Sequence, residues 1–460
     1  MINNKMTWVN CFSSRRYGFN KEESEIRTEY ERDWDRIIFS SPFRRLQNKT
    51  QVFPLPEEVF VHNRLTHSLE VASVGRSLGK KIGKHIASLT DVKDNDNARQ
   101  FYRNNLKNVI ASACLAHDLG NPAFGHSGEE AISKYFKNKK DDKVFRDRFS
   151  ECEWKDLINF EGNANALRIL TMQQKGKSKG GFRLTYSTIG SIIKYPCESI
   201  ASEGKDGEKH LKKYGYFKID EQVFLDVVKE LNMVDHSVNG KIRYKRHPFV
   251  YLVEAADDIC YNIIDLEDAH RLGIVEYEKI KEFLLAIIST NVDEKIDKVK
   301  KQLEILEEDK NEALSYLRAK SINTLTLKCC DVFIKNLDNI IEGNYNNTLL
   351  EDIPEVQATL EAISKISVKK IYNYIGVVKL ELAGFRIMSG LVEDFVTAAL
   401  TPKDEREKEH KKILELLPKQ FHFKEDESDY EKVMHIIDFI AGMTDLFALK
   451  LYRNLRGIEI

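Results

Sequence analysis

The sequence predicts an all-α fold: a helical core, further helices toward the C-terminus, and at most one small β-hairpin. Two observations carry this prediction. Helix breakers are scarce, because the 460 residues include only nine prolines and 23 glycines, below the usual shares of about 5% and ~7%. Apolar residues recur at helical spacing along most of the chain, whereas the alternation typical of strands is rare.

Four polar stretches are expected to be loops between the helices: residues 91–97, 173–181, 201–213 and 401–412. The best strand-like pattern covers 241–244, directly after an Asn-Gly turn signal, and predicts the hairpin. From about 275 to 315, apolar spacing and dense charge predict amphipathic helices that cover a core. A weak change of composition there predicts two regions: a core with an N-terminal extension at 1–275, and a helical region packed on it at 276–460.

Composition disfavours several classes of protein. A formal net charge of −1 gives no overall basic bias toward nucleic acid. Hydrophobic residues at 42% and charged residues at 31% are typical of a globular chain rather than a disordered one. The seven cysteines are scattered without a C-x-x-C pair, which disfavours a zinc ribbon or a disulfide framework. No apolar run approaches ~18 residues and no signal peptide is recognisable, so we expect a cytoplasmic protein without a membrane partner.

The first long helix is predicted from residue 63 to about 89. Its apolar stripe consists of Val71, Val74, Leu78, Ile82 and Ile86. His67 and Arg64 continue this stripe one and two turns earlier. Both side chains should therefore point toward the core rather than into solvent.

The next helix, at about 104–118, ends in a pair of polar residues. Its inward stripe of Leu106, Ile110 and Cys114 continues to His117, and Asp118 follows before a Leu-Gly-Asn-Pro stop signal. A single inward histidine is more often a hydrogen-bonded core residue than a ligand. Two imidazoles with an adjacent carboxylate are a common set of divalent-metal ligands. For His67, His117 and Asp118 the two interpretations are about equally favoured.

The helix predicted at 249–269 has a strongly acidic face. Opposite its apolar stripe lie Glu254, Asp257, Asp258, Tyr261, Asp265 and Asp268. Periodicity alone favours an ordinary solvated face. Five carboxylates without a cation repel one another, however, and a bound metal or a basic partner would reduce this repulsion. Burial of both faces of the helix would also explain the pattern.

His126 and Glu129 lie three residues apart at the predicted start of the following helix, on one face and within hydrogen-bonding reach. A carboxylate that holds an imidazole raises its basicity, which suits general acid or base catalysis. Glu129 also stabilises a helix N-terminus without any further role, so both interpretations stay open. The sequence has neither a P-loop nor a G-x-S-x-G nucleophile elbow. Any bound phosphate must therefore be held by side chains and metal.

The run of His67, His117-Asp118 and Asp257 matches the H…HD…D signature of the HD superfamily of metal-dependent phosphohydrolases. Longer segments carry a more specific likeness: SPFRRLQNKTQVFPL (41–55), NRLTHSLEVA (63–72), AHDLGNPAFGHSGEEAI (116–132), NFEGNANALRIL (159–170), EAADDICYNIIDLEDA (254–269), LELAGFRIMSGLVEDF (380–395) and IAGMTDLFALKLYRNLRG (440–457). From about residue 35 to the C-terminus the chain resembles the deoxyguanosine triphosphate triphosphohydrolase (dGTPase) family.

The resemblance implies an all-α HD-domain enzyme that hydrolyses a deoxynucleoside triphosphate, with dGTP as first candidate, to the deoxynucleoside and inorganic triphosphate. The family's ligands to one divalent ion, Mn²⁺ or Mg²⁺, match His67, His117, Asp118 and Asp257. Such an ion neutralises the α-phosphate and acidifies the water that attacks phosphorus. His126, held by Glu129, matches the family's catalytic pair and either protonates the leaving 5′-oxygen or deprotonates the water.

The resemblance also implies the substrate contacts. Arg64 matches a phosphate-binding arginine, and Lys194 with Tyr195 matches a second contact to the phosphate chain. The sugar contacts match Gln51, Tyr261 under the deoxyribose, and Asp265 at the 3′-hydroxyl. A tyrosine close beneath C2′ leaves no room for a 2′-hydroxyl, which would reject ribonucleotides.

Two other functions remain open from the sequence: an HD phosphohydrolase of broader dNTP or nucleotide specificity, and a regulatory protein that senses dNTPs with little turnover. The family implies a homo-oligomer, with subunit contacts expected in the C-terminal helices, and a second dNTP is a candidate effector. Local basic stretches give only weak support for nucleic acid as a partner.

Overall fold

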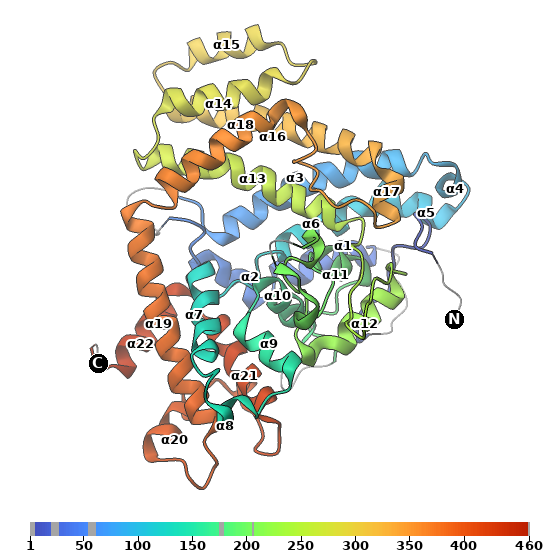
Figure 1. Ribbon diagram of the computed structural model, residues 1–460. Helices are drawn as coiled ribbons and strands as arrows, with labels where there is room; N and C mark the ends of the chain where they lie inside the picture. Colours follow the sequence, from blue (N-terminus) through green and yellow to red (C-terminus); the bar gives the residue numbers. More distant parts are fainter. Residues whose placement is uncertain (1–4, 20–26, 54–60, 174–178, 205–206, 459–460) are drawn as a thin grey trace.

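The computed structural model describes residues 5–19, 27–53, 61–173, 179–204 and 207–458. Over these residues the protein is all-α, as the sequence predicts, and β structure is limited to isolated bridges (Figure 1). None of the helices in the described ranges combines the length and apolar character needed to cross a membrane. The seven cysteines are all buried as free thiols.

The helices up to residue 275 are α1 (Glu29–Ile38), α2 (Ser41–Arg45), α3 (Arg64–Ile86), α4 (Thr90–Lys93), α5 (Asp96–Gln100), α6 (Leu106–Ala116), α7 (Gly125–Lys137), α8 (Lys143–Arg146), α9 (Glu151–Ile158), α10 (Gly162–Thr171), α11 (Tyr186–Ile192), α12 (Glu221–Glu230) and α13 (Val250–Arg271). Those beyond it are α14 (Tyr277–Ser289), α15 (Ile296–Ile305), α16 (Lys310–Lys335), α17 (Leu337–Ile341), α18 (Pro354–Ile366), α19 (Ile375–Leu400), α20 (Lys408–Glu415), α21 (Asp429–Ala441) and α22 (Asp445–Leu455). Two π-helical segments, η2 (Phe101–Asn105) and η7 (Ser367–Ile371), precede α6 and α19.

At the centre of the molecule α3 packs against α6, and α13 and α16 pack against α3. Gly75, Gly79 and Gly83 recur every fourth residue along the contact between α3 and the η2–α6 segment. A Cβ at these glycines would lie 2.5 Å from Cys114 Sγ, 2.9 Å from Lys107 Cα and 2.1 Å from the Tyr102 carbonyl oxygen, respectively. Because these positions have no side chains, the two helices can approach closely. The start of α3 carries His67 and the end of α6 is followed by His117, both candidate site residues.

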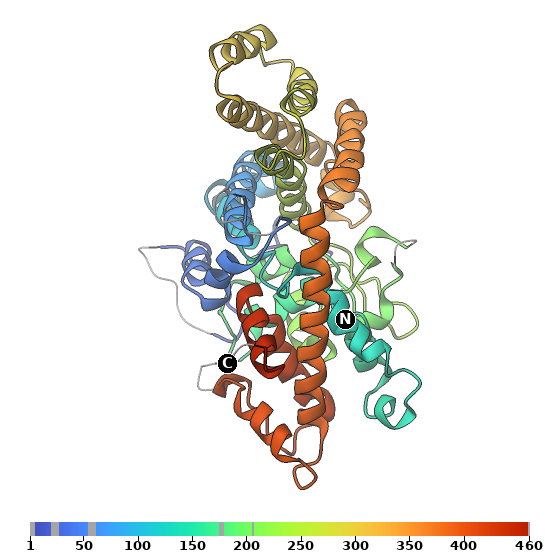
Figure 2. The same cartoon turned by 90° about the vertical axis from the view of Figure 1, so that its left-hand side faces the viewer.

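The buried apolar residues form two clusters. The larger cluster surrounds α3, α6, α13 and α16 and extends from Met6 to Val377. The smaller one joins α7 and α9 to α19 and α21. Helix α19 runs lengthwise along one side of the molecule, as Figure 2 shows, and packs against α7, α20, α21 and α22. Helices from late in the chain thus support elements of the first half, and the division near residue 275 stays a prediction.

The predicted boundaries need several corrections. Residues 91–97 are not a continuous loop but contain parts of α4 and α5, because the Asn95 side chain caps α5 by accepting the Ala98 N–H. The loop at 401–412 ends where α20 begins at Lys408. The helix predicted from about 104 begins as α6 at Leu106. Residues 174–178 and 205–206 of two other predicted loops lie outside the described residues.

The predicted hairpin forms only its turn and isolated bridges. Asn239 and Gly240 both have positive φ, at 53° and 77°, and bridges join Val238 to Lys241 and Asp235 to Tyr244. The Asn-Gly signal therefore identified the turn correctly. The amphipathic helices predicted from about 275 to 315 are confirmed as α14, α15 and the start of α16.

Candidate active site

The ends of α3 and α6 and the N-terminal half of α13 bring the predicted metal ligands together. Asn63 caps α3 in a reciprocal pair with Thr66, which places His67 at the start of the helix. His117 is the C-cap of α6, where Asp118 begins the following turn. Asp257 reaches the same point from α13, because α13 packs against both α3 and α6.

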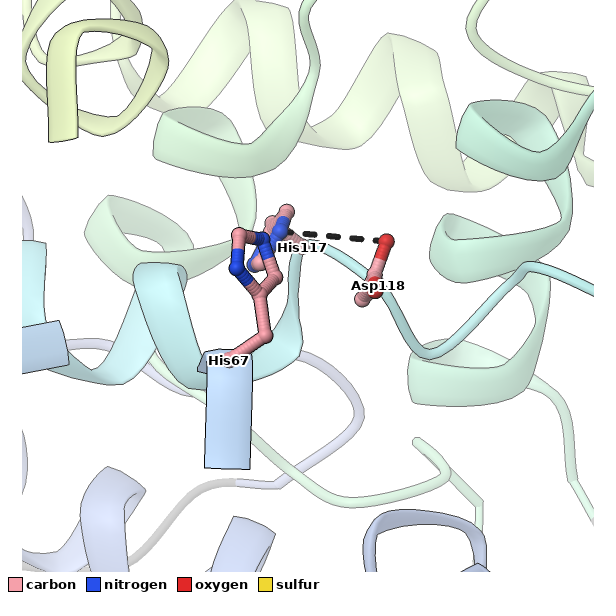
Figure 3. Close-up of side chains that lie close together, drawn as sticks. All are labelled: His67, His117 and Asp118. Atoms are coloured by element: carbon pink, nitrogen blue, oxygen red, sulfur yellow. Dashed lines mark ion pairs between the residues drawn. The ribbon is translucent and has the colours of Figure 1, made fainter. Parts of the chain in front are cut away.

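The side chains converge within a few ångströms. Asp257 Oδ1 lies 3.0 Å from His67 Nε2 and 3.4 Å from His117 Nε2. His117 Nε2 is also 3.8 Å from Asp118 Oδ1, the contact dashed in Figure 3. His117 Nδ1 donates to the Cys114 carbonyl oxygen at 2.6 Å, so Nε2 is the ring nitrogen that faces the carboxylates.

This group of side chains fits a divalent cation. His117 Nε2 is buried and makes no hydrogen bond to any described residue. Two imidazole nitrogens and two carboxylates are a donor set that such ions accept. Although burial opposes it, Asp257 and Asp118 raise the pKa of His117 to about 9. Burial likewise acts to raise the pKa of Asp257, but the two imidazoles hold it well below its usual range. The site thus stabilises positive charge at the point where a metal ion would replace a proton.

Asp118 is oriented by two donors. Arg64 Nη1 donates to Asp118 Oδ2 at 2.8 Å, and Asn121 Nδ2 donates to Oδ1. The Arg64 guanidinium lies against Gly125, where a Cβ would be 2.7 Å from Nη2 and the backbone φ is +55°. Glycine at position 125 therefore satisfies both the space and the backbone conformation that this arrangement requires.

His126 and Glu129 form the predicted pair at the start of α7. Glu129 Oε2 lies 2.8 Å from His126 Nδ1, and Oε1 accepts the Gly162 N–H at 2.9 Å. The hydrogen bond that His126 Nδ1 donates to Glu129 raises the pKa of His126 above its ordinary value, although burial opposes it. Glu129 is buried while the His126 side chain is exposed at the edge of the cavity described next.

A cavity of about 490 Å³ opens beside the candidate ligands, a volume within the range of small-molecule sites. Ten of the twelve residues predicted for the site line it: Gln51, Arg64, His67, His117, Asp118, His126, Lys194, Tyr195, Asp257 and Tyr261. Of the other two, Glu129 contacts His126, and Asp265 is buried without lining the cavity.

Basic side chains line the cavity near the candidate ligands. Lys194 Nζ lies 3.2 Å from Glu254 Oε1, and Arg246 donates to the other oxygen at 2.9 Å. Burial acts to lower the pKa of Lys194, but Glu254 raises it above its usual value, so this lysine is charged at neutral pH. Lys213 also lines the cavity and pairs with Glu161 at 2.7 Å. Glu254 on the acidic face of α13 is therefore covered by basic groups rather than solvated.

At another part of the wall, the rings of Tyr261 and Tyr372 stack with their centroids 6.2 Å apart and their planes at 21°. The Tyr372 hydroxyl donates to Asp265 Oδ2 at 3.3 Å. Burial, assisted by Asp268, raises the pKa of Asp265 to about 8. Gln51 Oε1 is buried and has no hydrogen-bond partner in the described ranges, so it is available to a ligand.

Sequence reasoning missed four contributors to the site. Asn121 lies three residues after Asp118, within the motif at 116–132, so its proximity to Asp118 could have been predicted from the sequence. Lys213 falls in a predicted loop, and Tyr372 follows η7 in a lysine-rich stretch; neither carries a local signal. Asp445, at the start of α22, accepts the N–H groups of Thr50 at 2.9 Å and Phe124 at 3.0 Å. These amides adjoin the cavity-lining segments, and only the packing of the chain reveals the contact.

Two domain families and several known proteins match this chain. The HD domain matches residues 64–159, and the phosphohydrolase-associated domain matches residues 353–454. The chain is 34% identical to a deoxyguanosinetriphosphate triphosphohydrolase-like protein of Synechocystis sp., over 99% of this chain and 100% of the relative. A protein of the same description from Pseudomonas aeruginosa is 33% identical, over 98% and 99% of the two chains.

A deoxyguanosinetriphosphate triphosphohydrolase of Yersinia enterocolitica is 31% identical, over 95% of this chain and 96% of the relative. The similarity therefore extends across almost the whole of both chains rather than the HD segment alone. Together with the His-Asp cluster and the all-α fold, it shows that the chain belongs to the dGTPase family within the HD superfamily of phosphohydrolases.

Proposed function

We propose that this protein hydrolyses a deoxynucleoside triphosphate, with dGTP as the first candidate, to the deoxynucleoside and inorganic triphosphate, and that it requires one divalent metal ion, Mn²⁺ or Mg²⁺. One observation carries the proposal. The His-His-Asp-Asp group, the His126–Glu129 pair and several cationic side chains meet at a single cavity. This combination suits hydrolysis of a phosphate ester.

The ion would be held by His67, His117, Asp118 and Asp257, whose donor atoms lie close together. When bound, it supplies charge neutralisation at the α-phosphate and a more acidic water. Arg64 and Asn121 keep the Asp118 carboxylate in its orientation through their hydrogen bonds. This support is the role that residues around a metal commonly have.

Cationic side chains would bind the triphosphate. Arg64, Lys194 and Lys213 line the cavity, and each is held by an acidic partner. Because those partners already fix the positions of the cationic groups, little reorganisation is needed when an anion binds. Binding of the phosphate chain along this wall would direct its α-phosphate toward the His-Asp cluster.

The His126–Glu129 pair would transfer the proton. Glu129 occupies His126 Nδ1, so Nε2 is the atom free to carry a proton toward the reaction. In the role we favour, Nε2 gives this proton to the 5′-oxygen of the sugar, which is a poor leaving group as an alkoxide. The raised pKa of His126 keeps more of the imidazole protonated near neutral pH.

The tyrosine pair would select the sugar. Tyr261 lines the cavity with its ring stacked on that of Tyr372, so the two rings support each other against displacement. A deoxyribose packed on this surface would leave no space for a 2′-hydroxyl. Asp265, which lies beside Tyr372, would accept the 3′-hydroxyl, the one free hydroxyl of a dNTP sugar, and Gln51 would make a further contact to the sugar.

The test is product identity. The purified protein is incubated with each of the four dNTPs and with GTP, in Mn²⁺ or Mg²⁺, with and without a second dNTP, and the anions are separated by ion chromatography. Release of triphosphate and deoxynucleoside in equal amounts is expected. Release of orthophosphate or pyrophosphate would contradict the proposal and favour another type of HD phosphohydrolase.

A comparison of variants tests the proton-transfer role and the alternative of a dNTP sensor. His126→Ala should lower kcat by ~10²-fold or more while dNTP binding persists. His435→Ala is the matched control, because His435 also pairs with a glutamate, Glu427, at 3.2 Å, and neither residue lines the cavity. Full triphosphate release by His126→Ala would show that the assignment is wrong.

A further inference from the structure

A second group of metal-ligating side chains lies outside the candidate active site. Glu208, His210 and His236 each direct one possible ligand atom to within 4.8 Å of the others. Glu208 Oε2 is 3.4 Å from His210 Nδ1, and Oε1 is 3.5 Å from His236 Nε2. The carboxylate therefore lies between two imidazoles from segments that are distant in sequence.

Both segments are held in place by their backbones. The Glu208 carbonyl accepts the Leu211 N–H at 2.8 Å. The His236 N–H donates to the Arg243 carbonyl at 2.9 Å, and Arg243 Nε donates back to the His236 carbonyl at 2.7 Å. The three side chains thus project from ordered turns rather than from free loops.

His210 has unused capacity to bind a ligand. Its side chain is only 4% exposed. Nδ1 is the ring nitrogen that faces Glu208 Oε2, at 3.4 Å, and Nε2, the other ring nitrogen, is buried without a hydrogen-bond partner among the residues that the structure describes. A buried imidazole nitrogen is normally hydrogen-bonded. The competing explanation is a plain ion pair, since Lys245 Nζ lies 2.9 Å from Glu208 Oε2. That pair occupies Glu208 Oε2 but does not explain why two imidazoles face the same carboxylate.

We propose that Glu208, His210 and His236 form a second metal site, specific for Zn²⁺ or a similar transition-metal ion. Two imidazoles and one carboxylate, with water in the fourth position, form a set that zinc accepts. Imidazole nitrogens favour zinc over magnesium or calcium. The bound ion displaces the Lys245 ammonium from the carboxylate.

The site lies on the segment that leads to the catalytic cavity. Lys212 and Lys213, which line that cavity, follow His210 by two and three residues. An ion shared with His236 would cross-link this segment to the turn at 235–244. Zinc would then hold the two lysines in position without touching the substrate.

Zinc binding by the full-length protein tests the proposal. After removal of metal, Zn²⁺ is titrated into wild type, His236→Gln and His435→Gln by equilibrium dialysis. His435 is the matched control, because its side chain is 27% exposed against 29% for His236 and it also faces a glutamate. We expect His236→Gln to lose one equivalent of zinc that wild type and the control retain, with Kd raised more than ~100-fold. Equal zinc content in all three proteins would overturn the proposal.

Two further measurements separate this site from the active site and from misfolding. His67→Ala removes a candidate active-site ligand, so the equivalent lost in His236→Gln should persist in His67→Ala. Wild-type crystals soaked in Zn²⁺ should show an anomalous peak among Glu208, His210 and His236. This measurement does not depend on the folding of any variant. Absence of that peak at a zinc concentration that saturates binding in solution would also overturn the proposal.

Discussion

Asp445 connects the C-terminal helices to the catalytic cavity. It lies in the first turn of α22, and its two carboxylate oxygens accept the N–H groups of Thr50 and Phe124. Phe124 has a left-handed φ of 61° and precedes the helix that carries His126. Such a conformation is uncommon for a bulky residue and costs about 1–3 kcal/mol. We predict that Asp445 is needed to maintain it.

The structure sets the size of the effect of Asp445→Ala. Each hydrogen bond to a charged acceptor contributes ~1.5–3 kcal/mol to stability. Because Asp445 is partly exposed and solvent weakens both bonds, the free energy of unfolding should fall by about 2–4 kcal/mol in total. Once released, Phe124 would relax toward negative φ and shift the start of α7. If 1.4 kcal/mol of transition-state stabilisation is lost in this way, kcat falls about tenfold. Asp445→Asn keeps one oxygen acceptor and should lose about half as much stability.

Thermal unfolding and steady-state dNTP hydrolysis measure these effects. Asp429→Ala is the control, because Asp429 also occupies the first turn of a helix, α21, but pairs with Arg148 at the surface. Its loss should change stability by less than about 1 kcal/mol. If Asp445→Ala had the Tm and kcat of wild type, the coupling between α22 and the start of α7 would be refuted.

Three other changes test the site and its surroundings. Glu129→Gln replaces the charged acceptor of the hydrogen bond that raises the pKa of His126 by a neutral amide oxygen, so the limb of the pH–rate profile that reports His126 should move to lower pH; an unmoved limb would count against the pair. Gly125→Ala places a Cβ 2.7 Å from Arg64 Nη2 at a positive φ, so KM for the dNTP should rise and Tm should fall. Wild-type values of KM and Tm would disprove the close approach of Arg64 to residue 125. Against the effect of burial, two carboxylates raise the pKa of His62 from 6.5 to about 10. Because the folded pKa exceeds the unfolded one, this stabilisation is complete below pH 6.5 and lost as the pH rises to about 10. The Tm difference between wild type and His62→Gln should therefore shrink across that range, and a constant difference would exclude the linkage.

Much of the fold could be predicted from local patterns in the sequence. The apolar stripe that predicted a helix from residue 63 corresponds to α3, and the one around 249–269 corresponds to α13. The breaks were less accurate. Residues 91–97 contain parts of two short helices, since a side-chain cap at Asn95 and packing outweigh polar composition there. The hairpin reduced to a turn and isolated bridges: Tyr244 pairs with Asp235 and Arg243 pairs with Cys197, but neither pairing extends into a ladder within the described residues.

The acidic face of α13 shows where periodicity fails. Spacing alone favoured solvent exposure for these carboxylates, yet Glu254 is buried against Lys194 and Arg246. Asp268 is buried against His62 at 2.9 Å. Periodicity identifies the faces of a helix but does not identify what covers each face, since the covering groups come from other parts of the chain.

The sequence by itself determined the fold class, through spacing along single helices, and its motifs carried the resemblance to the HD superfamily that implied the residues proposed for the chemistry. Only the tertiary structure revealed Tyr372 behind Tyr261, Lys213 in the cavity wall and Asp445 beneath the start of α7. Each of these contacts joins segments that are far apart in the chain. No local pattern encodes such contacts, because they form only when the hydrophobic cores bring the helices together.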